Sequence, residues 1–219
     1  MTTLSYDPTH CTLCPRRCGA DRTQAKGRCR MPDAPVVARA ALHHWEEPPL
    51  SGTQGAGTVF FSGCSLGCVF CQNDSISQND FGKAISVARL REIFFELIAA
   101  GAHNIDLVNP THYARVVAQA LEDPLPVPVV WNSGGYDRVE TLAALEGKIQ
   151  IYLPDYKYTD PDTARRYAGA ADYPETARAA IREMVRQTGP YQLDENGILT
   201  RGVILRHLLL PGGLNQAKE

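Results

Sequence analysis

Short apolar runs of strand character alternate with helical segments from residue 58 onward, and this alternation limits the possible folds more than any other feature. The runs are 58–61, 105–108, 127–131, 149–153 and 203–210, and between them apolar residues recur at helical spacing over 90–98, 113–121, 139–145 and 177–185. Such alternation is typical of β-α-β crossovers and a parallel sheet. We therefore predict an α/β fold whose functional loops follow the carboxyl ends of the strands.

The segment before residue 58 is different. Residues 1–30 show little apolar periodicity and contain four of the seven cysteines, so we expect a metal to hold this short segment in place of a core. One further strand is predicted at 36–41. We predict a metal module with a connecting strand over residues 1–50, and the α/β domain over 51–219.

Composition narrows the classes of partner. The net charge is −2, and the basic residues before position 31 favour a solvated face over a nucleic-acid site. The amino terminus lacks the apolar core of a signal peptide, and no run reaches the roughly 18 apolar residues of a membrane span. We expect a cytoplasmic protein without a membrane or nucleic-acid partner. Cysteines there are better explained by metal or cluster binding than by disulfides.

Three cysteines follow the strand 58–61 as Cys64-x3-Cys68-x2-Cys71. Three thiolates this close can ligate three irons of one cubane and leave the fourth iron open to a small molecule. Gly63 and Gly67 allow the backbone to wrap around such a cluster. The alternatives are a zinc site or buried thiols, but zinc prefers four ligands and cysteines paired as C-x2-C.

This spacing, with Phe70 before the last cysteine, resembles the signature of the radical S-adenosylmethionine (SAM) superfamily. Between residues 11 and 213, the chain is similar to radical SAM iron–sulfur proteins described as homologues of pyruvate formate-lyase activating enzyme. The stretches that carry this similarity are 61–64, 71–73, 109–113, 151–158 and 206–212. The resemblance implies an open, partial parallel β/α barrel, a [4Fe–4S] cluster on the three cysteines, and SAM as cosubstrate.

The resemblance also implies which positions contact SAM. These are Phe70 beside the cluster, Asn109 near the SAM ammonium, Asn132 and Ser133 after the third strand, Asp155 and Lys157 after the fourth, and Arg206 near the SAM carboxylate. Each has a structural alternative. The loop after 105–108 can simply start a helix, 133–135 can be a plain turn, Asp155 and Lys157 can form an exposed ion pair, and Arg206 can pair with a core carboxylate such as Asp155.

The earlier cysteines follow the pattern Cys11-x2-Cys14-x3-Cys18-x10-Cys29. Four soft ligands suit tetrahedral zinc or an auxiliary iron–sulfur cluster, and unligated thiols are the alternative. Between the two cysteine groups, Glu46 or Glu47 can line the active site, although a surface position at the end of a strand is favoured.

We therefore predict an oxidoreductase of the radical SAM type in which no side chain acts as acid or base. The resemblance implies a glycyl-radical protein as substrate and a flavodoxin or ferredoxin as electron donor. Modification of another peptide or a small molecule is one alternative, and a non-catalytic metal-binding scaffold is another. Relatives continue beyond the fifth strand for several dozen residues, so a shortened form is expected.

Overall fold

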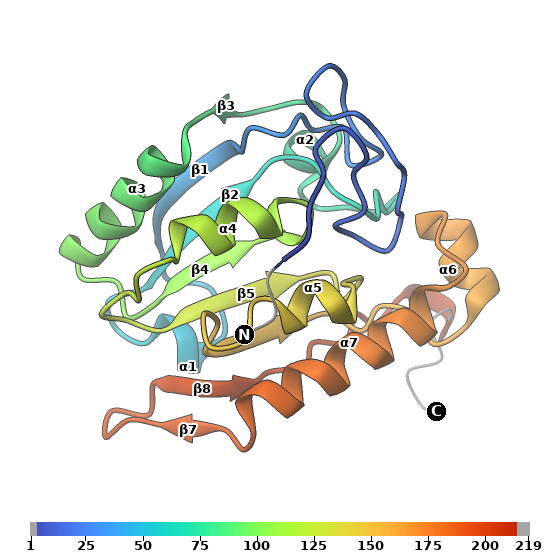
Figure 1. The fold of residues 1–219 in the computed structure, drawn as a ribbon. Coiled ribbons are helices and arrows are strands. Elements are labelled where there is room, and N and C mark those ends of the chain that lie inside the picture. Colours follow the sequence, from blue (N-terminus) through green and yellow to red (C-terminus); the bar gives the residue numbers. More distant parts are fainter. Residues whose placement is uncertain (1–3, 214–219) are drawn as a thin grey trace.

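The computed structural model describes residues 4–213 and is built on one large sheet (Figure 1). Its strands within this range are β1 (Val36–His43), β2 (Ala56–Phe61), β3 (Lys83–Ala84), β4 (Ile105–Val108), β5 (Val129–Ser133), β6 (Ile151–Pro154), β7 (Gln192–Leu193) and β8 (Leu199–Val203). They are arranged in the order β3-β1-β2-β4-β5-β6-β8-β7, and β2, β4, β5, β6 and β8 run parallel. The predicted α/β class with a mostly parallel, open sheet is confirmed.

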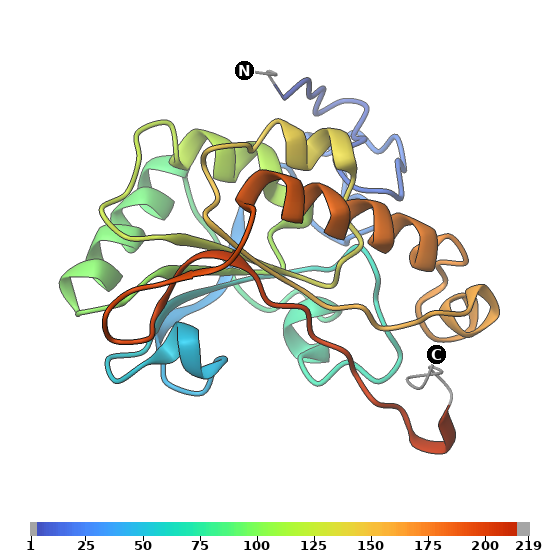
Figure 2. The ribbon, with the colours of Figure 1, turned by 90° about the horizontal axis from the view of Figure 1, so that it is seen from below.

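Helices cover the two faces of the sheet unequally. Figure 2 shows α3 (Val87–Ala99), α4 (Ala114–Ala120), α5 (Val139–Ala143) and α7 (Tyr173–Thr188) on one face, and α1 (Pro48–Ser51) and α2 (Asp74–Ser77) on the other. Helices α3, α4, α5 and α7 enclose the main core together with Phe61, Leu107 and Trp131 of the strands. A smaller apolar cluster, including Val130 and Leu153, lies on the opposite side of the strands. Helix α6 (Pro161–Ala168) and the amino-terminal segment lie toward the carboxyl ends of the parallel strands (Figure 1).

Most elements lie where the sequence predicts them, with one clear error. The strand predicted over 203–210 is wrong, because β8 covers Leu199–Val203 and pairs with β7 in a hairpin. Beyond Val203 the backbone still pairs with β6 as far as Arg206, because the Ile204 N–H donates to the Tyr152 carbonyl and the Arg206 N–H to the Pro154 carbonyl, both at 3.0 Å, but residues 207–210 form no strand. Leu205 and Leu209 are 52% and 72% exposed, so this apolar run is not a buried strand.

The strand predicted over 36–41 is β1, and it joins the main sheet antiparallel to β2. Within residues 4–213, none of the helices has the length and apolar character needed to cross a membrane.

Candidate functional site

The loop that holds Cys64, Cys68 and Cys71 turns sharply away from β2. Gly63 has φ +82°, and a β-carbon there would lie 2.6 Å from the Cys29 carbonyl oxygen, so the turn requires glycine. The Gly63 N–H donates to the Ile76 carbonyl at 3.0 Å, and the Cys64 N–H donates to the Cys29 carbonyl at 3.2 Å. We call residues 64–71 the cluster loop.

Each sulfur of the cluster loop accepts a hydrogen bond. The Leu66 N–H donates to Cys64 Sγ at 3.4 Å. The Tyr158 hydroxyl donates to Cys68 Sγ at 3.4 Å, and the Ser77 hydroxyl donates to Cys71 Sγ at 3.3 Å. Sulfur accepts hydrogen bonds well as thiolate and poorly as thiol, and such donors tune cysteines that ligate iron–sulfur clusters.

Burial raises the pKa of the Cys68 thiol, and the nearby Cys64 and Cys71 act in the same direction. The Tyr158 hydrogen bond and the charge of Lys157 oppose this shift. Without a metal, Cys68 is therefore a poor thiolate at neutral pH. Coordination by a metal would have to remove this thiol proton against the effect of burial.

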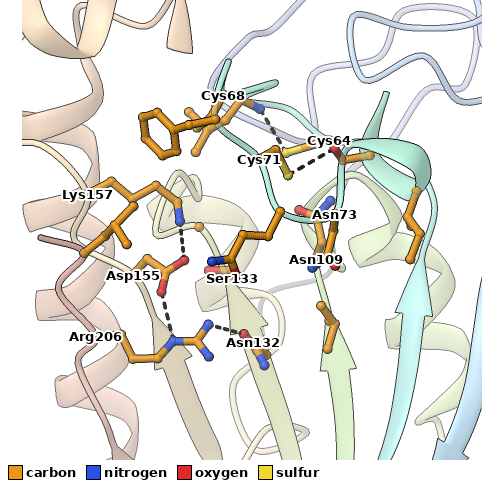
Figure 3. A pocket seen from close by; sticks show the side chains of 18 of the residues that line it. Cys64, Cys68, Cys71, Asn73, Asn109, Asn132, Ser133, Asp155, Lys157 and Arg206 are labelled. Atoms are coloured by element: carbon orange, nitrogen blue, oxygen red, sulfur yellow. Dashed lines mark hydrogen bonds and ion pairs between the residues drawn. The ribbon is translucent and has the colours of Figure 1, made fainter. Parts of the chain in front are cut away.

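A pocket of about 710 Å³ opens beside the cluster loop (Figure 3). Its lining includes the three cysteines of the loop and all seven residues predicted to contact the cofactor, namely Phe70, Asn109, Asn132, Ser133, Asp155, Lys157 and Arg206. The strand-end residues converge because the carboxyl ends of β4, β5 and β6 lie side by side. The structure thus brings the predicted residues together at one site.

Phe70 belongs to an aromatic wall of this pocket. Its ring centroid lies 6.2 Å from that of Tyr158 and 6.1 Å from that of Tyr167. Tyr158 is also the donor to Cys68. The same tyrosine therefore supports both the aromatic side chain and one sulfur of the cluster loop.

Asn109 has φ +59°, a conformation that glycine prefers and that asparagine tolerates better than most residues. Its N–H donates to the Asn132 carbonyl at 2.7 Å, and its side-chain amide donates to the Gly63 carbonyl. Asn109 therefore ties the end of β4 to both neighbouring loops while it lines the pocket.

The loop after β5 is a tight turn, as the structural alternative for residues 133–135 proposed. Gly135 has φ +74°, and its N–H donates to Ser133 Oγ at 3.1 Å. The Ser133 hydroxyl in turn donates to Asp137 Oδ2 at 2.5 Å. Burial raises the pKa of Asp137, and hydrogen bonds from Ser133, Thr111 and Trp131 oppose that shift. The hydrogen bond between Ser133 and Asp137 thus fixes the turn, while Ser133 also lines the pocket.

Arg206 joins three strand ends. It donates to Asp155 Oδ1 at 2.9 Å, to Glu46 Oε1 at 3.0 Å and to Asn132 Oδ1 at 2.7 Å (Figure 3 draws the contacts with Asp155 and Asn132). Lys157 Nζ lies 2.5 Å from Asp155 Oδ2. The predicted pairing of Arg206 with Asp155 is present. Asp155 and Lys157 do form an ion pair, but both side chains are only 19% exposed, so it is not the exposed pair of the alternative interpretation.

Two acidic residues of this region differ from expectation, Glu46 in its burial and Asp106 because the sequence analysis did not single it out. The Glu46 side chain is only 11% exposed, so the favoured surface position for it is wrong. Asp106 on β4 is fully buried, and its pKa is raised by burial and by the Glu46 carboxylate. Asn132 Nδ2 donates to both carboxyl groups, at 3.1 Å to Glu46 and 3.4 Å to Asp106. A carboxyl group inside the apolar run 105–108 is the one sequence signal for this cluster. Glu47 lines the pocket.

The first cysteine group lies in the segment 11–29, which we call the cysteine segment. Cys11, Cys14 and Cys29 are buried and Cys18 is exposed. Burial raises the pKa of Cys14 to about 12, with smaller contributions from the other three cysteines. Across residues 4–213, no three His, Cys, Asp or Glu side chains converge as the ligands of a single metal ion would. Cluster thiolates bind different irons and need not converge.

Comparison with known proteins finds an uncharacterized relative and shows no family. No protein-family model matches the chain. The chain is 29% identical to an uncharacterized protein of Methanocaldococcus jannaschii, over 96% of its own length and 60% of that protein. It therefore spans about three fifths of the length of this relative. Because this relative is uncharacterized, the similarity assigns no activity, and a proposed function must rest on the residues of the site.

Proposed function

We propose that this protein is a radical SAM enzyme that binds a [4Fe–4S] cluster through Cys64, Cys68 and Cys71. The observation that carries the proposal is the cluster loop itself. Three cysteines stand on one wall of a pocket, and each sulfur accepts a hydrogen bond from a different residue. Soft thiolates are the ligands that iron–sulfur clusters require, so the donor set suits this group.

When bound, the cluster supplies the reducing chemistry. With one electron from a reduced flavodoxin- or ferredoxin-type protein, it would allow reductive cleavage of the C5′–S bond of SAM and transfer of a substrate hydrogen atom to the 5′-deoxyadenosyl group, with methionine and 5′-deoxyadenosine as products. The side chains of the chain bind and orient the reactants and exclude water. No side chain is proposed to act as acid or base in this chemistry.

The opposite wall of the pocket suits the amino-acid part of SAM. Arg206 and Lys157 offer cationic donors to a carboxylate, and Asp155 and Asn109 offer oxygen acceptors to an ammonium group. Because the charged groups of this wall are paired with one another, the wall is dipolar and not strongly of one sign. A zwitterion matches such a wall better than a simple anion does. Asn132, Ser133 and Phe70 complete the proposed SAM contacts.

We further propose that the substrate is a protein, attacked at a backbone glycine. Val69 and Leu209, each next in sequence to residues that line the pocket, are 71% and 72% exposed. Apolar side chains exposed near a pocket are available for contact with a macromolecule. Cys11, Cys14, Cys18 and Cys29 are proposed to hold a second metal, either zinc or an auxiliary cluster. A single zinc ion would require their side chains to move closer together, because no three side chains of this kind converge within residues 4–213.

The central proposal is tested by anaerobic reconstitution with iron and sulfide, followed by dithionite and SAM. A variant with Cys64, Cys68 and Cys71 all changed to Ala should yield no 5′-deoxyadenosine. The control is Val69→Ala in the same loop, whose exposed side chain contributes little to the fold. Undiminished product in the triple variant would refute the proposal.

The substrate proposal is tested with deuterium-labelled candidate proteins, by following label into 5′-deoxyadenosine. An electron paramagnetic resonance doublet on the partner protein would support a glycyl radical. Label transfer from a small metabolite and from no protein would exclude a protein substrate.

For the second metal, the triple variant should still contain zinc or iron, and removal of Cys11 and Cys14 should release it.

A further inference from the structure

The cysteine segment packs directly against the cluster loop. The Cys29 carbonyl accepts the Cys64 N–H, and a β-carbon at Gly63 would lie 2.3 Å from Met31 Cγ. Arg22, only 2% exposed, donates to the His112 carbonyl at 2.6 Å and so anchors the segment to the connection after β4. The two cysteine groups, separate in sequence, therefore share one interface.

Arg16 makes the most extensive contact across this interface. Its Nε donates to the Ser65 carbonyl at 2.8 Å, and its Nη2 donates to the carbonyls of Leu66 at 3.3 Å and Ala168 at 2.7 Å. Its Nη1 donates to the Gly169 carbonyl. The guanidinium carbon also lies 5.3 Å from the ring centroid of Tyr136. The planar, branched guanidinium is suited to bridging several fixed acceptors, and lysine lacks this geometry.

The acceptors of Arg16 explain what it holds together. Ser65 and Leu66 lie between the first two cysteines of the cluster loop, whereas Ala168 and Gly169 end helix α6. Carbonyls at a helix carboxyl terminus carry partial negative charge, so a cation there is stabilising. The Val69 N–H also donates to the Tyr167 carbonyl at 3.0 Å. The first half of the loop is therefore linked to α6 through Arg16, and the second half is linked to it directly.

We propose that Arg16 is a positioning residue for the iron–sulfur cluster, by which the cysteine segment holds Cys64 and Cys68 at the spacing that retains it. This inference rests on the proposed function, because it assumes that the cluster loop binds a cluster. Arg16 touches neither cluster nor substrate in this role. It acts through the backbone of the loop, whose carbonyls it fixes against α6.

The test compares Arg16→Gln with Arg17→Gln in the full chain. Arg17 is the adjacent residue, but its side chain is 60% exposed and pairs with Glu140 at 3.9 Å. The first readout is hydrogen exchange in the cluster-free protein. Backbone amides of the cluster loop should exchange at least about tenfold faster in Arg16→Gln, the factor expected if only one of the four charge-assisted hydrogen bonds were lost. They should be unchanged in Arg17→Gln, and amides of β5 should be unchanged in both.

The second readout is the reconstituted protein. Arg16→Gln should lose its cluster to an iron chelator about tenfold faster than wild type does, and the electron paramagnetic resonance signal of its reduced cluster should broaden. Arg16→Lys keeps the charge without the branched donors, so its rate of cluster loss should lie between those of wild type and Arg16→Gln. This variant also guards against the possibility that Arg16→Gln simply fails to fold.

The outcomes separate the two proposals. If wild type assembles a cluster and Arg16→Gln retains it as long, with unchanged exchange, the role of Arg16 is refuted while the proposed function stands. If wild type assembles no cluster, the proposed function and the positioning role both fail, and faster exchange would then mark Arg16 as a purely structural residue.

Discussion

Acid should destabilise this protein through His112, one of its most completely buried titratable side chains. His112 is 1% exposed, and its Nε2 lies 2.7 Å from the Ser62 carbonyl oxygen. Its Nδ1 has no hydrogen-bond partner among the described residues. Burial, followed by the positive charge of Arg22, lowers the pKa of His112 from 6.5 to about 3. The folded protein therefore keeps this ring neutral over most of the acid range.

The sign and size of the effect follow from linkage. The unfolded chain protonates this histidine below about pH 6.5, whereas the folded protein does not until about pH 3. The stability that His112 contributes is complete above pH 6.5 and is lost as the pH falls through that window, by about 1.4 kcal/mol per pH unit. At pH 5 the loss relative to pH 7 is about 2 kcal/mol.

Urea unfolding at pH 7 and pH 5 measures this loss. In His112→Gln the amide can still donate to the Ser62 carbonyl but does not titrate, so the fall in unfolding free energy between the two pH values should be about 2 kcal/mol smaller than in wild type. The control is His44→Gln, because His44 is exposed. If wild type and His112→Gln lose equal stability between pH 7 and pH 5, the buried neutral histidine does not govern the acid response.

Two further changes test the pocket and its turn. Asp155→Ala should weaken SAM binding by about tenfold, the cost of one charged hydrogen bond. The melting temperature should fall only moderately, because Lys157 loses its partner but Arg206 still donates to Glu46 and Asn132. A collapse of stability with unchanged SAM binding would make Asp155 purely structural. Gly135→Ala should lower the unfolding free energy by more than about 2 kcal/mol, because backbone strain adds to a β-carbon 2.1 Å from the Asp155 carbonyl oxygen. In urea unfolding, Gly147→Ala, which has positive φ but nothing within 4 Å, should lose less.

The fold was predictable where periodicity and burial agree. The apolar run 105–108 is β4 at its predicted bounds, and the segment 90–98 lies inside α3, which Ser86 caps by accepting the Arg89 N–H. The prediction of a strand over 203–210 was wrong because most apolar residues of this run are not buried. The true hairpin has a weak pattern, but Asn196-Gly197 between β7 and β8 is a recognised turn signal, and Gly197 has φ +77°.

The pocket was predictable to the extent that it follows from the sheet. Asn109, Asn132 and Asp155 end neighbouring parallel strands, so any such sheet brings them together. Arg16 was not predictable. It lies in a basic segment that looks like a solvated face, and its partners are backbone carbonyls, which every residue carries. A sequence therefore holds no signal for these contacts.

The polar wall of the pocket is built so that Arg206 can change partners. Three of its five N–H groups already have acceptors, so a ligand carboxylate can bind the remaining two N–H groups or replace one of the three acceptors. Neither acidic partner would then be left as an unpaired charge, which would be costly in a buried site. Asp155 keeps Lys157 at 2.5 Å, and Glu46 keeps the Asn132 amide at 3.1 Å. The duplicated contacts thus lower the cost of releasing Arg206. If the proposed zwitterionic ligand binds here, the buried Glu46 contributes to its binding without lining the pocket.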